Sequence, residues 1–243
     1  MTAIESSGPF RELHLAFARI LAARHAPGML IDMLVGQAFD LFEDNIGVQT
    51  QDLPPLACQK GCPSCCILRV TATAPEIFLL ADYVQRIDAT PQGAALALPR
   101  RIAHAHRATG GLAEAERMAL RKPCPFIIHG VCIVHPVRPL ACRGHASFDR
   151  RACARAAAGR DVEVPVSEPH LNLRGLIQNA LQSALRSAGL SWGLHEMNHG
   201  LVLALDGHGR RGRWLEGGDS LGPIVAEFDA TSAAERFDQL LAN

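Results

Sequence analysis

The chain has 243 residues, 24 basic and 24 acidic residues, and a hydrophobic content of 48%. This length suits one large domain or two small ones, and the hydrophobic content excludes an intrinsically disordered chain. No apolar run reaches the roughly 18 residues that a membrane span requires. Glu5, Arg11 and Glu12 interrupt the N-terminal stretch where a signal peptide needs an apolar segment. We therefore expect a cytoplasmic protein with a single domain, residues 1–243, and no membrane partner.

Hydrophobic periodicity predicts a mainly α-helical fold, because apolar residues recur every three or four positions over most of the chain. A capping box from Thr73 to Glu76 indicates the start of one helix. Gly110 and Gly111 divide two alanine-rich helices, and residues 207–223 are expected to form a glycine-rich loop. We find no internal repeat and no alternation of strands and helices. The other predicted helices cover residues 10–25, 29–46, 170–188, 194–205 and 231–242, and the last three belong to a C-terminal helical part, residues 166–243.

Residues 124–145 have a different pattern. Two short apolar segments flank His129 and Gly130, which predicts a tight hairpin. Two prolines then leave room only for a short helix near Cys142. Asp149 is expected to cap a further short helix that carries Cys153.

The chain has eight cysteines, all between residues 58 and 153. In a reducing compartment, such a cluster is typical of metal binding or catalysis rather than of disulfides. A buried, purely apolar role is the competing interpretation, and it suits Cys153 best because that residue lies in an alanine-rich run. The candidate metal ligands are Cys58, Cys62, Cys65, Cys66, Cys124, Cys132, Cys142 and Cys153.

The first cysteine group spans residues 58–66. Cys62 and Cys65 have the Cys-x2-Cys spacing that lets two sulfurs face one ion, and Cys58 precedes Cys62 by about one helical turn. Cys65 and Cys66 are adjacent, and neighbouring side chains normally diverge. Cys66 is therefore expected to serve a second metal or to be a spare thiol.

The second group consists of Cys124, Cys132 and Cys142, and the hairpin is expected to bring Cys132 near Cys124. We predict one metal site, or two close sites, built from both groups within a cysteine-rich core at 55–155. Residues 100–155 hold 11 basic and 3 acidic residues, a net charge of +8. Arg138 and Arg143 flank Cys142, so this charge can compensate thiolates. The alternative of nucleic-acid binding is disfavoured, because one Tyr and two Trp supply few stacking surfaces.

This cysteine pattern resembles that of the bacterial YkgJ-like proteins, which are named for a CxxCxxCC motif and described as zinc- or iron-chelating. The resemblance covers about residues 55–155 and implies binding of zinc, iron or an iron–sulfur cluster. It implies no single reaction, since related domains occur in proteins of different roles, including flagellin lysine methylases. The first spacing here is three residues instead of two, and His135 replaces an expected aromatic residue. His135 is thus either an additional ligand or a surface residue. The matching segments are Cys58-x3-Cys62-x2-Cys65-Cys66, Cys124-Pro-Phe, Cys132 and Arg138-Pro139-Leu-Ala-Cys142-Arg143.

Two other chemistries share parts of the pattern. The spacing of Cys58, Cys62 and Cys65 is also that of radical S-adenosylmethionine enzymes, but their (β/α) barrel requires alternating strands that this sequence lacks. His195 and His199 belong to an HExxH motif, which on one helix would bind zinc for a hydrolase. Glycines on both sides weaken that helix, and no third ligand is evident.

We therefore predict a metal-binding protein that holds an iron–sulfur cluster, with 4Fe–4S favoured, or zinc through cysteine thiolates. Three closely spaced cysteines with a distant fourth are the arrangement that favours a cluster. The expected role is in redox chemistry, metal handling or maturation, with the metal or cluster and a protein as partners. A metal- or cluster-dependent enzyme that acts on a small molecule or peptide is the alternative.

Overall fold

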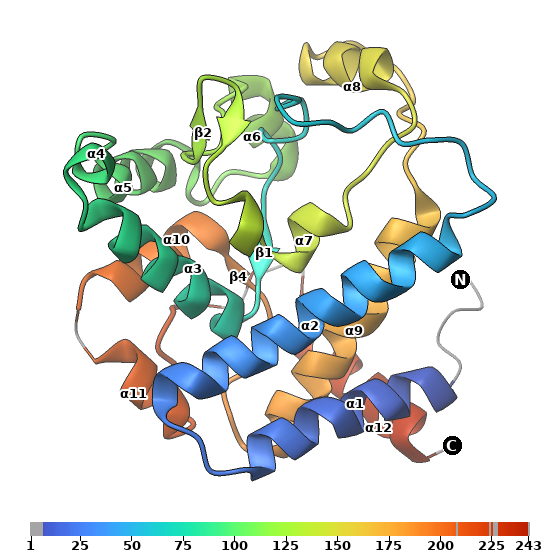
Figure 1. The fold of residues 1–243 in the computed structure, drawn as a ribbon, viewed down its shortest axis with the longest axis vertical. Helices are drawn as coiled ribbons and strands as arrows, with labels where there is room; N and C mark the ends of the chain where they lie inside the picture. Colours follow the sequence, from blue (N-terminus) through green and yellow to red (C-terminus); the bar gives the residue numbers. More distant parts are fainter. Residues whose placement is uncertain (1–6, 208, 224, 226–227, 243) are drawn as a thin grey trace.

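The computed structural model describes residues 7–207, 209–223, 225 and 228–242. Its N-terminal half begins with two long helices, α1 (Ser7–Ala22) and α2 (Pro27–Gln49), whose apolar faces pack against α9 (Glu168–Ser187). The last helix, α12 (Ala230–Ala242), lies against α1 and α9, where Phe10 and Phe237 stack with ring centroids 5.8 Å apart. These helices form the lower half of the molecule in Figure 1.

A second layer of helices joins this bundle to the cysteine-rich part. Helix α3 (Ala74–Asp88) packs against α2 and α10 (Met197–Leu205), and α10 also packs against α5 (Leu98–Thr109). Gly200 allows the close approach of α10 to α3, since a Cβ atom there would lie 2.6 Å from Ile77 Cδ1. The shorter helices are α4 (Pro91–Ala94), α6 (Glu114–Leu120) and α11 (Arg210–Leu215).

Two small antiparallel sheets complete the cysteine-rich part. Strand β1 (Thr71–Ala72) pairs with β4 (His195–Glu196), and β2 (Ile127–Ile128) pairs with β3 (Val131–Cys132). The second pair is the predicted hairpin, and both turn residues, His129 and Gly130, have the positive φ that a tight two-residue turn requires. The 3-10 helix η1 (His135–Val137), α7 (Leu140–Arg143) and α8 (Arg150–Ala157) follow.

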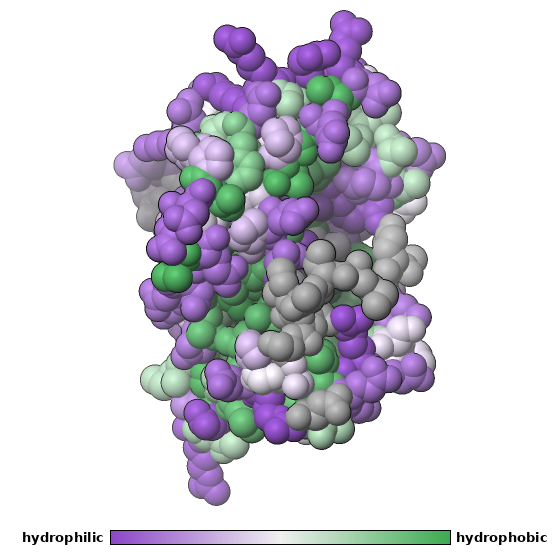
Figure 2. Space-filling view, turned by 90° about the vertical axis from the view of Figure 1, so that its right-hand side faces the viewer, coloured by the Kyte–Doolittle hydropathy of each residue, from purple (hydrophilic) through white to green (hydrophobic). Residues whose placement is uncertain are grey.

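The hydrophobic core is continuous from the lower bundle to the cysteine-rich part. Phe10, Phe17 and Phe42 are buried in the bundle, whereas Phe126 is buried beside the hairpin. On the face shown in Figure 2, hydrophilic side chains project from the top, and hydrophobic residues reach the surface mainly in the lower half. No described helix is long and apolar enough to cross a membrane.

The mainly helical prediction is confirmed, as are the hairpin, the capping box and the Asp149 cap, whose side chain accepts from the Arg151 and Ala152 amides. Two predictions of secondary structure are wrong. The expected glycine-rich loop at 207–223 contains α11, because Trp214 is fully buried and anchors a helical turn. The helix expected over 194–205 begins at Met197, because the two preceding residues extend to pair with β1. Residue 5, used against a signal peptide, and residue 208 of the expected loop lie outside the described residues.

Candidate metal centre

The first cysteine group lies in an irregular segment between α2 and β1. Gly61 has a φ of +84°, and the Cys62 amide donates to the Gln59 carbonyl at 3.1 Å. The Cys66 amide donates to the Pro63 carbonyl at 2.9 Å. Two successive turns therefore fold the segment back on itself, as a Cys-x2-Cys knuckle requires.

A backbone hydrogen bond ties the two cysteine groups together. The Cys124 amide donates to the Cys66 carbonyl at 2.7 Å, although the two residues are distant in sequence. The hairpin register sets Cys132 opposite Ile127, and the thiols of Cys124 and Cys132 interact electrostatically. The expected approach of Cys132 to Cys124 is confirmed.

A buried glutamate holds the short helix that carries Cys142. Glu76 Oε1 accepts from the Leu140 amide at 2.7 Å, while Glu76 Oε2 accepts from both the amide and the hydroxyl of Thr73 at 2.8 Å. Glu76 is 1% exposed, and burial raises its pKa, whereas hydrogen bonds from Thr73 and Leu140 oppose that shift. Sequence reasoning found the Thr73 contact but missed the Leu140 contact, which fixes α7 beside the first cysteine group.

The inner thiols lie close enough to affect one another. The Cys66 thiol donates a hydrogen bond to Cys65, which lowers the pKa of Cys65 and raises the pKa of Cys66. Burial raises the pKa of Cys124 to about 12, and it also raises the pKa of Cys142, with added repulsion from Cys124 and Cys65. The expectation that the side chains of Cys65 and Cys66 diverge is wrong, because their thiols are in contact.

Cys58 and Cys153, the outer thiols, lie next to the inner thiols of the first cysteine group. Cys58 interacts with Cys65, Cys62 and Cys153, and burial raises its pKa. The Ser147 amide donates to Cys58 Sγ at 3.4 Å, a backbone contact of the kind that stabilises bound thiolates. Cys153 on α8 is therefore near the first group rather than isolated among alanines.

All eight cysteines are free thiols. They belong to the 58–66 segment, the hairpin region, α7 and α8, and the labelled ones of these elements lie in the upper part of Figure 1. Within the described residues, no three His, Cys, Asp or Glu side chains already have an arrangement that could hold a metal ion. The donor set fits soft or borderline metals, because thiolate sulfur favours zinc, copper(I) and iron–sulfur clusters.

The two arginines beside Cys142 have different roles. Arg138 interacts with the thiols of Cys65, Cys132 and Cys142, and its Nε atom is buried with no hydrogen-bond partner among the described residues. This position agrees with the predicted charge compensation.

Arg143 instead points away from the sulfur atoms. It stacks on Phe39 at 3.8 Å from the ring centroid, pairs with Glu43 and donates to the Pro136 carbonyl at 2.7 Å. Of the two arginines predicted to compensate thiolate charge, Arg143 is thus held by the carboxylate and the aromatic ring of α2 instead.

Among the described histidines, His195 and His199 do not lie on one helical face. His195 is buried in β4. Glu196 is the N-cap of α10, and its carboxylate accepts a hydrogen bond from the His199 amide at 2.8 Å. The His199 ring stacks on His106 with centroids 4.7 Å apart. The HExxH residues are thus split between a strand and a helix, which removes the shared helical face. His135 is exposed and bonds Arg138 Nη1 at 2.7 Å.

Neither a family model, nor a curated protein, nor a solved structure matches the chain. The likeness to YkgJ-like proteins stays a prediction. The described sheets are two antiparallel pairs, so the part of the chain that the structure describes contains no (β/α) barrel of the radical S-adenosylmethionine type.

Proposed function

We propose that the chain binds an iron–sulfur cluster, with 4Fe–4S favoured, or zinc through its cysteine thiolates. The observation that carries this proposal is the gathering of free thiols from residues 58–66, 124–132, 142 and 153. Free thiols in this number persist in the cytosol, where disulfides are rare, and we propose that location. The role would be in redox chemistry, metal handling or maturation.

The electrostatic contacts among the thiols support a cluster ligand set of Cys58, Cys62, Cys65 and Cys142. Cys58 interacts with Cys62 and Cys65, and Cys65 interacts with Cys142. Three nearby sulfurs with one distant sulfur suit a 4Fe–4S cluster, which supplies electron transfer when bound. Arg138 would offset part of the negative charge of four thiolates.

The remaining thiols are enough to hold a further ion. Cys66 interacts with Cys124, and Cys124 interacts with Cys132. Since these buried thiols repel one another when ionised, a cation among them would relieve that repulsion. Small movements of the 58–66 turns would bring the sulfurs together, because that segment belongs to no helix or strand.

The alternative of a metal-dependent enzyme requires an open coordination position, whereas a closed thiolate shell implies a structural or carrier role. A metal bound by thiolates together with an exchangeable water, or by thiolates together with added cyanide, would favour the enzyme. Four sulfur ligands per metal and no response to cyanide would favour the carrier.

The test is anaerobic purification from iron-replete cells, followed by analysis of iron, zinc and acid-labile sulfide. We expect a brown, sulfide-containing protein for the parent chain, loss of most iron and sulfide in Cys62→Ser, and loss of the further ion in Cys124→Ser. Ser64→Ala is the matched variant within the first cysteine group, and Cys153→Ser removes a thiol of α8 that belongs to neither ligand set; both should retain most of the metal. Colourless protein with stoichiometric zinc would select zinc, whereas metal-free parent protein would refute the proposal.

A further inference from the structure

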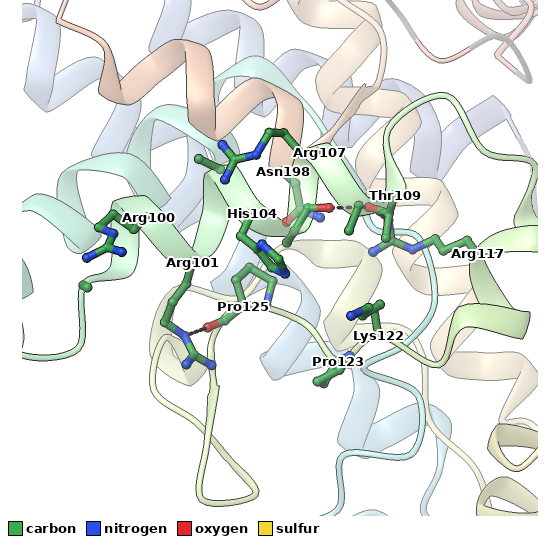
Figure 3. A pocket seen from close by; sticks show the side chains of 14 residues that line it. Arg100, Arg101, His104, Arg107, Thr109, Arg117, Lys122, Pro123, Pro125 and Asn198 are labelled. Carbon is green, nitrogen blue, oxygen red and sulfur yellow. Dashed lines mark hydrogen bonds between the residues drawn. The ribbon is translucent and has the colours of Figure 1, made fainter.

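A cavity of about 680 Å³ lies beside the cysteine-rich part, outside the proposed metal centre. Its walls come from α5, from Arg117 of α6, from residues 122–125 and from Asn198 of α10. None of the lining residues is a cysteine. Figure 3 shows the labelled side chains around this space, contributed by several elements, with Arg100 apart from the others and Arg101 joined to Pro125. The cavity lining therefore has its own chemistry, although Arg117, Pro123 and Pro125 also neighbour Cys124.

The lining is strongly basic and contains no carboxylate. Arg100, Arg107 and Lys122 are exposed at the cavity, and no ion pair involves them among the described residues. Arg101 is held at the rim, because its Nε donates to the Pro125 carbonyl at 2.9 Å. Arg117 is 4% exposed and lies 3.7 Å from Glu196, which partly compensates its charge. An anion in the cavity would face several cations without a competing carboxylate on the walls.

A buried polar side chain provides a second, independent indication of a ligand. Asn198 is 0% exposed and lines the cavity, yet neither its Oδ1 nor its Nδ2 has a hydrogen-bond partner in the described part of the chain. Buried amides are nearly always hydrogen-bonded, and unsatisfied ones often indicate a bound group. Thr109 supplies a hydroxyl on the same wall, and its Oγ1 accepts a hydrogen bond from Arg117 Nη1 at 2.7 Å.

The remaining walls are formed by His104, by alanines at the start of α5 and along it, and by Pro123 and Pro125. A cavity of several hundred Å³ that combines apolar walls with a few polar groups is typical of a small-molecule site. Arginine forks bind phosphate and carboxylate groups in two-point contacts. We propose that this cavity binds a small molecule that carries two or more negative charges and is no larger than a nucleotide. Asn198 binds an uncharged polar group of that molecule.

Titration calorimetry of the full chain, at low salt and at 0.2 M salt, tests this proposal. The probes are pyrophosphate, ADP and citrate, and adenosine is the uncharged comparison. We expect saturable binding of at least one anion and none of adenosine. Pyrophosphate or ADP alone would identify a phosphorylated ligand, and citrate alone would identify a polycarboxylate. The variants Arg107→Ala and Lys122→Ala should each weaken binding about tenfold, as loss of one charged hydrogen bond does.

Two further variants separate a built site from general surface charge. Arg150→Ala, on α8 away from the cavity, should leave anion affinity unchanged. Asn198→Leu should weaken the binding of a probe that carries an additional polar group, ADP or citrate, about tenfold. The melting temperature of this variant should be equal to that of the parent or higher, because the Asn198 amide makes no hydrogen bond in the free protein. The proposal is overturned if no probe binds, if Arg150→Ala weakens binding as much as Arg107→Ala, or if a single-stranded oligonucleotide binds more tightly than every probe.

Discussion

Glu76 is the residue whose removal should most affect the placement of the second cysteine group. It accepts hydrogen bonds from the amides of Thr73 and Leu140, both of which are buried contacts. Removing an acceptor leaves a buried donor unsatisfied, which costs about 1–3 kcal/mol for each donor. Glu76→Ala leaves two amides unpaired, so we expect a loss of about 4 kcal/mol in the free energy of unfolding. Glu76→Gln retains one acceptor oxygen and should lose about 2 kcal/mol.

The pH dependence of this loss has a definite sign. Burial raises the pKa of Glu76 above its usual value of 4.5, so the folded state holds the proton more tightly than the unfolded state. The corresponding stabilisation is complete below pH 4.5 and is lost as the pH rises through the raised pKa. The stability difference between the parent protein and Glu76→Gln should therefore shrink as the pH rises from 4 toward neutrality.

Urea unfolding of the metal-free, reduced chain, followed by far-ultraviolet circular dichroism, measures both effects. Glu116→Gln is the matched control, since Glu116 makes the same capping contact with the Ala113 amide at 2.7 Å but on the surface. It should change stability by about 0.5 kcal/mol or less. A Glu76→Ala protein within 1 kcal/mol of the parent, with its Leu140 amide still protected from hydrogen exchange, would refute the reasoning.

Two further predictions concern the metal centre and the HExxH motif. Chelation should reduce hydrogen-exchange protection of residues 58–145 far more than that of α1 and α9, because the cysteines lie in the turns of 58–66 and the short elements of 124–145, where bound metal would supply folding energy. Equal protection with and without chelator would contradict this. His195→Ala and His199→Ala should leave metal content unchanged, since one histidine lies in β4 and the other stacks on His106; loss of one zinc per chain in either variant would show that the motif binds metal.

Local sequence signals predicted the elements that depend on local chemistry. The hairpin was predictable because His129 and Gly130 form the left-handed turn between two apolar pairs. The start of α3 was predictable because Thr73 and Glu76 form a reciprocal cap. The strands β1 and β4 were not, since two-residue strands carry no periodicity and their partners lie far apart in the sequence.

The two arginines around Cys142 show why a charge pattern does not determine the direction of a side chain. Both flank the same cysteine, and the sequence assigned them one role. In the structure, Phe39 and Glu43 of α2 bind Arg143, while Arg138 is left beside the thiols. The contact that separates them comes from a helix distant in the sequence, so no local pattern contains it.

Glu76 is a second case in which a local sequence motif does not predict a contact made over a long distance in the sequence. Its local partner, Thr73, uses one carboxylate oxygen, and the motif says nothing of the other. The second oxygen binds the first residue of α7 and so fixes the position of Cys142 relative to Cys66. A helix cap that is buried, rather than exposed as at Glu116, has a free acceptor that the fold must pair with a donor. The cysteines predict the chemistry of the candidate centre, whereas the position of its second cysteine group follows from this buried acceptor, which the cysteine pattern does not contain.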